Sequence, residues 1–279
     1  MRKLNRCYAL VAGVVLSILA GVGSVLAADA FQPGCTLPWA SIAKKRPIDA
    51  TCAAQGVTTS APHQAQNRAK NELCVTGAPI DITFQIFKTL QRRADDAGIP
   101  FGSSNRLPSD RSGLRRLHKL SNGQWIGEGT LVRYVAFISH PRNSNTSGGE
   151  SVNCKLPKAE NNDIHMDLLR NPDEPACRSI TAEIIPHSRP EMWQVKYLEK
   201  VMGRPVRITG HLFFDASHRP CTSDTDRIST KRASIWEIHP VYAIDVCLNK
   251  TVGACQAKNE SKWLALDQWL NQEQEEDED

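Results

Sequence analysis

The chain has 279 residues, 41% of them hydrophobic and 23% charged, with 34 basic and 30 acidic side chains. Three basic residues precede Cys7 and six acidic residues lie in Glu273–Asp279, so the +4 total conceals a body with a charge of +7. That excess favours an anionic partner, although it is also ordinary for a soluble surface. No apolar run after Ala30 is long enough to cross a bilayer, so we expect no integral membrane segment there.

The first residues have the three parts of a signal peptide. Met1–Arg6 is basic, an apolar run extends from Tyr8 to Leu26, and small residues follow at residues 27–30. We therefore predict a signal peptide over residues 1–27, with cleavage after Ala27 or Ala30, and a periplasmic or secreted location. The alternative is an uncleaved membrane anchor, because the apolar run is nearly long enough to span a bilayer.

Cysteine use agrees with export. Eight cysteines follow the predicted signal peptide: Cys35, Cys52, Cys74, Cys154, Cys177, Cys221, Cys247 and Cys255. An even number in an exported chain indicates disulfide bonds, with scattered free thiols as the alternative. No Cys-x-x-Cys pair is present, so neither a zinc ribbon nor a thioredoxin-type site is expected. The sequence does not determine the pairing.

Residues 28–122 are predicted to form an extension with one helix. Asp29–Ala69 has little periodicity, and we expect it to be irregular and held by Cys35 and Cys52. The helix is predicted over Asp81–Ala97, with Asp81 as its cap and Gly98 at its end. Gly98–Asn122 is a basic, loop-rich stretch.

Residues 123–250 are predicted to form a five-stranded barrel domain. The expected order is strand, strand, strand, helix, strand, strand: Gly129–Ser139, Asn162–Leu169, Arg178–Ile185, Pro190–Met202, Pro205–Phe214 and Ala233–Cys247. This β-β-β-α-β-β order is that of the OB-fold, and an open α+β sheet is the alternative. We expect a mainly β protein with flanking helices. In residues 251–279 we predict a helix over Ser261–Leu270 and a disordered acidic tail.

Alternation along the predicted strands separates core residues from residues of the opposite face. Ile164, Met166 and Leu168 fall on the core side of the second strand, as do Val206, Ile208, Leu212 and Phe214 on the fourth. Trp236 and Ile238 do so on the fifth, where Pro240 indicates a bulge or an edge. The opposite face then holds the candidate ligand-binding or catalytic residues, which are Asp163, His165, Asp167, His211, Glu237 and His239.

Imidazoles and carboxylates together can bind a divalent metal ion or transfer protons. His165, His211 and His239 are the candidate metal ligands, and Glu183, Asp215 and His218 lie on the same faces or in the adjoining loop. No HExxH, G-x-S-x-G or phosphate-binding glycine loop is present. The alternative is an ordinary polar outer surface.

Four blocks carry a resemblance: Gly129–Ser139, Asp163–Leu168, Val206–Asp215 and the WEIHPV segment Trp236–Val241. They resemble those of uncharacterised exported bacterial proteins with an OB-type domain, and the resemblance implies fold and location more than activity. The Asp/Arg/Glu pattern of secreted nucleases similar to staphylococcal nuclease is not recognisable. We expect an exported OB-type binding module with an oligomeric or protein ligand. The alternative is a metal-dependent hydrolase, of phosphodiesterase or nuclease type, that uses the His/Asp/Glu cluster.

Overall fold

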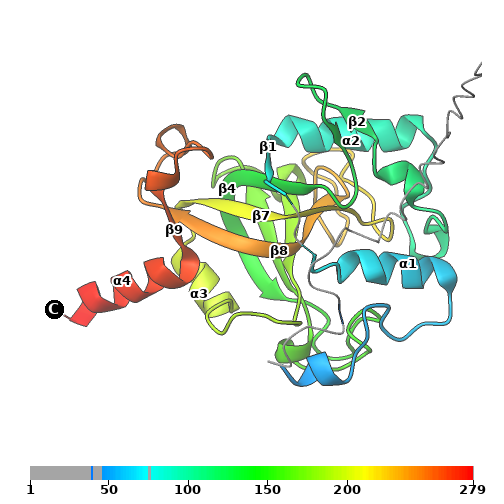
Figure 1. Cartoon of the computed structure of the whole chain (residues 1–279), viewed down its shortest axis with the longest axis horizontal. Coiled ribbons are helices and arrows are strands. Elements are labelled where there is room, and N and C mark those ends of the chain that lie inside the picture. The colour runs from blue at the N-terminus through cyan, green and yellow to red at the C-terminus, as the bar shows by residue number, and fades with distance from the viewer. Residues whose placement is uncertain (1–38, 40–45, 75–76, 279) are drawn as a thin grey trace, which may run out of the picture.

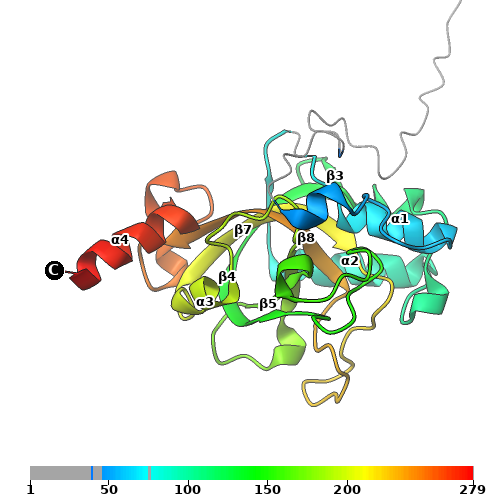
Figure 2. The ribbon, with the colours of Figure 1, turned by 90° about the horizontal axis from the view of Figure 1, so that it is seen from below.

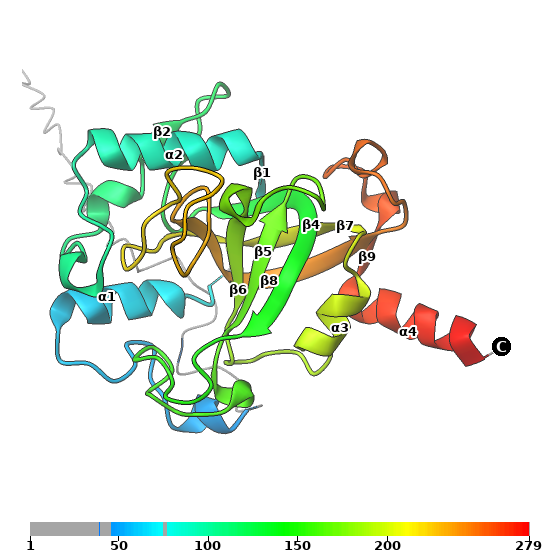
Figure 3. The same ribbon diagram turned by 180° about the vertical axis from the view of Figure 1, so that it is seen from behind.

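Five strands close into a barrel at the centre of the molecule. The computed structural model describes residue 39, residues 46–74 and residues 77–278. The barrel consists of β4 (Leu131–Asn143), β5 (Ile164–Leu169), β6 (Ile180–Ile184), β7 (Pro205–Phe214) and β8 (Trp236–Cys247). These strands lie in the order β4-β5-β6-β8-β7, and β7 pairs with β4 to close the ring (Figures 1 and 3).

The predicted order of the barrel elements is confirmed. A short helix, α3 (Val195–Lys200), follows the third barrel strand. All neighbouring barrel strands are antiparallel except β6 and β8, which run parallel and meet at Ala182 and Ile238. The chain can make this parallel pairing because α3 and β7 lie between the two strands in the sequence.

Within the part of the chain that the structure describes, four α-helices and four short strands surround the barrel. The helices α1 (Ala61–Lys70) and α2 (Phe84–Asp96) lie at one end, with α3 and α4 (Leu266–Glu278) at the other (Figures 1 and 3). β1 (Ile80–Ile82) pairs with β4, and β9 (Trp263–Ala265) pairs with β8. β2 (His118–Lys119) and β3 (Trp125–Ile126) form a separate pair beside α2 (Figure 1). Among the described residues, no helix is both long and apolar enough to span a membrane.

Strand alternation fills the barrel interior as the sequence predicts. The core contains Ile164, Met166, Leu168, Val206, Ile208, Leu212, Phe214, Trp236 and Ile238. The ring of Trp236 lies 5.2 Å from that of Phe214, and Trp236 has no exposed surface. Apolar burial of this kind is the main favourable term in folding, so these alternating side chains define which face of each strand points inward.

A close approach of two strands occurs at Gly210. The pairing of β7 with β8 shifts register on both sides of this residue, which agrees with the irregularity predicted from Pro240. A Cβ atom at Gly210 would lie 2.4 Å from the Pro240 carbonyl oxygen and 2.6 Å from the Ile238 side chain. Only glycine fits this position without displacement of one strand.

Disulfide bonds connect distant parts of the chain. The bonded pairs are Cys52–Cys154, Cys177–Cys221 and Cys247–Cys255, and Cys74 is also disulfide-bonded. All seven cysteines in the described part of the chain are therefore oxidised, which confirms the predicted disulfide framework there. Cys35 and the predicted signal peptide lie outside the described residues.

The extension is more ordered than the sequence predicts. All but the last residue of α1 (Ala61–Lys70) lies in the stretch Asp29–Ala69 that is expected to be irregular, because the polar residues of α1 contact the barrel domain rather than following an apolar period. The prediction that Asp81 caps a helix is wrong. Asp81 lies in β1, where its carboxylate accepts a 2.7 Å hydrogen bond from Arg133. Helix α2 begins at Phe84 after Thr83, and Gly98 follows its end with a φ of 64°.

Two further boundaries differ from prediction. Helix α3 begins at Val195 rather than at Pro190, because the residues before it form a turn in which Trp193 is buried. At the C-terminus, Trp263–Ala265 pairs with β8 as a strand before α4 begins. Helix α4 then continues to Glu278, through most of the acidic segment predicted to be disordered, and the Glu273 carboxylate lies 3.9 Å from Arg204.

Candidate metal centre

The candidate site lies on the outer face of the barrel, where β5, β6 and β8 adjoin. Strand alternation places His165, Glu183 and His239 on this face, opposite the core residues. The sequence predicted this orientation, yet these side chains are buried rather than exposed. A polar outer surface of the barrel would account for the polar residue types at these positions, but it does not account for their burial.

The extension covers this face through polar contacts. Asn67 of α1 donates hydrogen bonds to the Gln55 carbonyl and the Ser151 hydroxyl, and Asn71 donates to the Ala54 carbonyl. The Cys52–Cys154 disulfide joins the extension to the loop of residues 144–163, between β4 and β5. Seen from below, the α1 segment lies beside the ends of the barrel strands (Figure 2). The site is thus closed by a cover held by hydrogen bonds and one covalent link.

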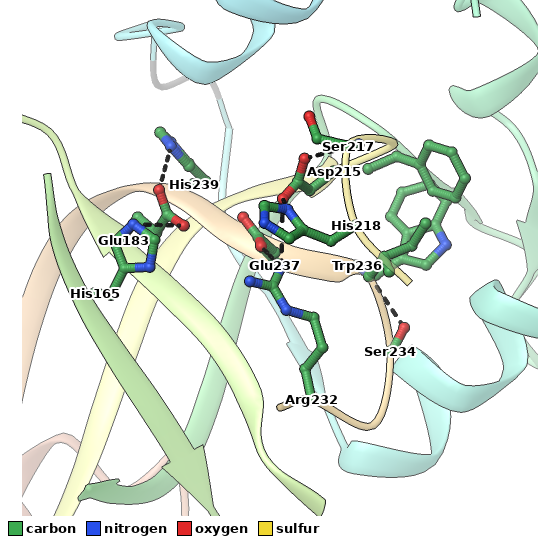
Figure 4. A network of polar contacts seen from close by, with 12 residues as sticks. His165, Glu183, Asp215, Ser217, His218, Arg232, Ser234, Trp236, Glu237 and His239 are labelled. Carbon is green, nitrogen blue, oxygen red and sulfur yellow. Dashed lines mark hydrogen bonds and ion pairs between the residues drawn. The ribbon is translucent and has the colours of Figure 1, made fainter. Parts of the chain in front are cut away.

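Three side chains converge beneath this cover. One ligand atom from each of Asp163, Glu183 and His239 lies within 4.8 Å of the others. The Nε2 atom of His239 is 3.0 Å from Oε2 of Glu183 and 3.8 Å from Oδ2 of Asp163. His165 adds its Nε2 atom 3.2 Å from Oε1 of Glu183 (Figure 4). Strands β5, β6 and β8 and the residue that precedes β5 therefore contribute to one cluster.

Several polar atoms of this cluster lack a well-aligned hydrogen bond. Oδ1 of Asp163 accepts one from Asn153 at 3.2 Å, but Oδ2 of Asp163 accepts none. Oε2 of Glu183 and both ring nitrogens of His239 are likewise buried without one among the described residues. Buried polar atoms are rarely left unpaired, because the loss of water is otherwise uncompensated. A bound ligand or ordered water would satisfy them.

The buried layer around the triad is also short of positive charge. Among the described residues, four buried carboxyl groups and the partly exposed Glu150 are accompanied by three cations, Lys70, Arg189 and Arg232; the buried carboxyl groups are those of Asp163, Glu183, Asp215 and Glu237. With neutral imidazoles this leaves two uncompensated negative charges. Isolated buried charges are costly, so the layer requires protons or a bound cation to be stable.

The pKa shifts express the same imbalance. Burial raises the pKa of Asp163 to about 6, and burial together with the nearby Glu183 charge raises the pKa of Glu237 well above its usual range. Burial would also raise the pKa of Glu183, but His165, Lys70 and His239 outweigh it and hold this pKa well below the usual range. For Lys70, burial opposes the charged form, but the surrounding carboxylates dominate and raise its pKa.

A second polar group adjoins the triad. Arg232 donates from Nη1 to Asp215 at 3.4 Å and forms a short contact with Glu237. The buried Asp215 carboxylate also bonds Nδ1 of His218 at 2.5 Å and accepts from the Ser217 amide at 3.1 Å (Figure 4). The His218 side chain is 38% exposed, so this pair links the buried layer to solvent.

The structure separates the remaining predicted residues from the triad. Asp167 accepts a 3.2 Å hydrogen bond from Arg142 at the edge of the layer. His211, one of the predicted metal ligands, lies on β7 with its Nδ1 atom 3.1 Å from the Tyr242 hydroxyl, outside the cluster. Of the predicted metal-binding histidines, His239 belongs to the triad and His165 adjoins it, while Glu183 and Asp163 supply the carboxylates.

Sequence reasoning missed Lys70, Glu150 and Arg232. Lys70 directly follows the segment Asp29–Ala69 that is expected to be irregular, and the other two lie in loops, so strand alternation gives no signal for them. Charged residues of this kind are normally solvated, and only tertiary structure reveals their burial.

Comparison with family models, with curated proteins and with solved structures found no match for the chain.

Proposed function

We propose that this protein is an exported binding module of OB type whose barrel face holds a divalent metal ion at Asp163, Glu183 and His239. The observation that carries the proposal is the convergence of these three ligand atoms within 4.8 Å, buried and incompletely hydrogen-bonded. Divalent metal ions bind carboxylate oxygen and imidazole nitrogen, and the mixed donor set suits Mn²⁺ or Zn²⁺.

The separations of the ligand atoms are compatible with such an ion. Around an ion bound at about 2.1 Å, neighbouring ligand atoms lie about 3–4 Å apart. The His239 nitrogen is 3.0 and 3.8 Å from the two carboxylate oxygens. An added divalent charge would also offset the excess negative charge of the layer.

The position of the site supports the OB assignment. Strand order, the single helix after the third barrel strand and the parallel pairing of β6 with β8 agree with that fold. OB-folds bind ligands on the face of their second and third strands and at the flanking loops. His165 and Glu183 lie on the equivalent strands, β5 and β6. Disulfide bonds support an oxidising compartment, hence export.

Metal binding can be tested with matched histidine variants. Mature protein from an oxidising compartment should contain close to one equivalent of Mn²⁺ or Zn²⁺ by mass spectrometry, and calorimetry should show rebinding after chelation. His239→Gln and Glu183→Gln should weaken binding by more than about 100-fold, beyond the loss usual for outer-shell partners. His211→Gln is the control, since it removes a buried histidine outside the cluster. Metal-free wild type that binds neither ion would refute the proposal.

A metal-dependent hydrolase is the second candidate function. The His218–Asp215 pair favours it, because a buried carboxylate that fixes one ring nitrogen leaves the other available as a general base or acid. Assays on nucleic acid and on simple phosphodiesters, with and without chelator, distinguish the two. Chelator-sensitive cleavage that His218→Ala abolishes, with metal binding retained, would favour the hydrolase.

A further inference from the structure

A pocket of about 610 Å³ lies away from the candidate metal centre. It is lined by residues of β1, of the start of α2, of β4 and of the loop between β8 and β9. Figures 1 and 3 show β1 and this loop near β4. The described lining contains none of the three proposed metal ligands, so the pocket is a separate candidate site.

The walls of this pocket are mainly apolar. Its apolar and aromatic lining residues are Ile82, Phe84, Tyr134, Val135, Val252 and Ala257. At the rim, Val252 is 39% exposed, so apolar surface there faces solvent. The Cys247–Cys255 disulfide closes the loop that carries this rim and holds it against the barrel. Apolar cavities of about 300–1,000 Å³ are typical of sites for small organic molecules.

The charged groups at the edge of the pocket already have partners. The Arg170 guanidinium group donates a 3.3 Å hydrogen bond to Glu174 and lies 4.3 Å from the centre of the Phe84 ring. The Asp81 carboxylate accepts a 2.7 Å hydrogen bond from Arg133. A charged ligand would lose its water here and find no unpaired counter-ion in return. The edge therefore favours an uncharged ligand.

One polar group of the lining is unsatisfied. The Tyr134 hydroxyl is buried and has no hydrogen-bond partner among the described residues. Burial raises the pKa of Tyr134 well above its usual range, so the hydroxyl stays protonated and can donate. By contrast, the Tyr242 hydroxyl donates to the Glu72 carbonyl. An unpaired buried hydroxyl is costly, and an oxygen atom of a ligand would remove that cost.

We propose that this pocket binds an uncharged, mainly apolar small molecule whose carbonyl oxygen accepts a hydrogen bond from the Tyr134 hydroxyl. The carbonyl would be the innermost part of the ligand, because Tyr134 is 3% exposed whereas Val252 at the rim is 39% exposed. The apolar walls would supply most of the affinity, and the single hydrogen bond would fix the orientation.

An uncharged fluorescent ketone is the first probe. Prodan is a naphthalene that carries a propionyl and a dimethylamino group, and its emission moves to shorter wavelength when it leaves water. Chelator-treated wild type should bind it saturably, with this shift. N-Phenyl-1-naphthylamine and its 8-sulfonate differ only in charge, and the uncharged compound should bind at least about tenfold more tightly, since the pocket offers the sulfonate no free cation.

Substitutions that fill the pocket locate the binding. Val252→Trp and Ala257→Trp each place an indole in the pocket from the loop, and each should weaken Prodan binding by at least about tenfold, because apolar area is lost to the ligand. Val57→Trp is the matched control, since Val57 is 48% exposed and lies outside the described lining. Circular dichroism and urea unfolding confirm the fold, and two filling positions guard against a variant that does not fold.

Two tyrosine variants test the hydrogen bond. Tyr134→Phe keeps the ring and removes only the hydroxyl, so Prodan affinity should fall by about two- to tenfold, the usual effect of one hydrogen bond. The emission of bound Prodan should also move further to shorter wavelength, because its ketone has lost a donor. Tyr242→Phe is the control and should leave affinity and emission unchanged.

Each part of the proposal can be overturned separately. Wild type that binds no Prodan, or folded Val252→Trp and Ala257→Trp proteins that bind it as wild type does, overturns the pocket as a binding site. Unchanged affinity and emission in Tyr134→Phe overturn the role of the hydroxyl. A sulfonate that binds as tightly as the uncharged compound overturns the ligand class. All measurements use metal-free protein, so none of these results bears on the proposed metal site.

Discussion

The Nζ atom of Lys70 lies 3.9 Å from Oε2 of Glu183, where the extension meets the barrel. It also lies 3.3 Å from Oε2 of Glu150, so the last residue of α1 neutralises a loop carboxylate and a strand carboxylate together. Lys70 is buried despite its charge. A cation of the protein itself thus contacts the same oxygen atom that would bind the proposed metal ion.

Lys70→Met should increase the affinity for the metal ion and lower the unfolding free energy of the metal-free protein. Removal of the ammonium group abolishes the competing cation, so the affinity for Mn²⁺ should rise by about tenfold, equivalent to about 1.4 kcal/mol. The same change leaves buried carboxylates uncompensated, so metal-free stability should fall by about 3–5 kcal/mol. Calorimetry and urea unfolding measure the two effects. Equal metal affinity in both proteins would show that Lys70 and the ion do not compete.

His211 should make the protein sensitive to acid. Burial lowers the pKa of His211 from 6.5 to about 4, and a backbone contact with Cys74 opposes that shift only in part. The unfolded chain therefore binds a proton at higher pH than the folded protein does. Stability is fully present above about pH 6.5 and is lost as the pH falls toward 4, by up to about 3 kcal/mol.

The variant His211→Gln isolates this contribution. Its unfolding midpoint in urea should depend less on pH than that of wild type between pH 7 and pH 4.5. The nearby Glu72 carboxyl group titrates in the same range, because burial raises its pKa to about 7, and its contribution has the opposite sign. Glu72 is common to both proteins, so the difference between them reports His211. Parallel pH profiles would contradict the assignment.

Thiol titration in denaturant, without reductant, should detect no reactive thiol from the described cysteines of the mature protein. Each of the seven is disulfide-bonded. With Cys35 the only further cysteine after the predicted signal peptide, at most one thiol per chain is expected. Protein prepared from the reducing cytosol is the comparison and should give more. Two or more reactive thiols in protein from the oxidising compartment would be incompatible with the observed pairs.

Two tryptophans provide a matched test of burial. Trp236 has no exposed surface, whereas the Trp125 side chain on β3 is 42% exposed. Trp236→Ala should cost about 3–5 kcal/mol of unfolding free energy, because it empties a large site in the barrel core. Trp125→Ala should cost less than about 1 kcal/mol, as is usual for surface changes. Similar losses in urea unfolding would mean that Trp236 does not occupy a tightly packed position.

The barrel could be predicted from the sequence because its strands alternate. Met166 and Trp236 point inward and His165 and Glu237 outward, as a period of two requires, and β7 has the predicted bounds of Pro205–Phe214. Alternation assigns a side chain to a face, but it does not say what covers that face. Lys70 of α1 contacts Glu183 on the face that carries His239, and no apolar period predicts the position of α1.

The candidate site was therefore predicted in part. Asp163, His165 and His239 were identified by residue type and strand face, and the structure brings them together with Glu183. His211 has the same residue type and strand face, yet it lies against Tyr242. Two strands on one barrel face can direct side chains to different neighbours, because barrel curvature and register set the distances between them. Such distances are not encoded in local periodicity.

The lack of space at Gly210 has a consequence for the chemistry of the barrel face. A single methyl group there would strike the Pro240 carbonyl oxygen, and Pro240 follows His239 directly in the chain. The smallest rearrangement that removes this clash would be a local displacement of β8, which would also move the imidazole of His239. Gly210→Ala would therefore change no charge and none of the proposed ligands, yet it would alter the positions of the three side chains relative to one another. The close backbone contact between Gly210 on β7 and Pro240 on β8 thus helps to determine the position of the His239 side chain.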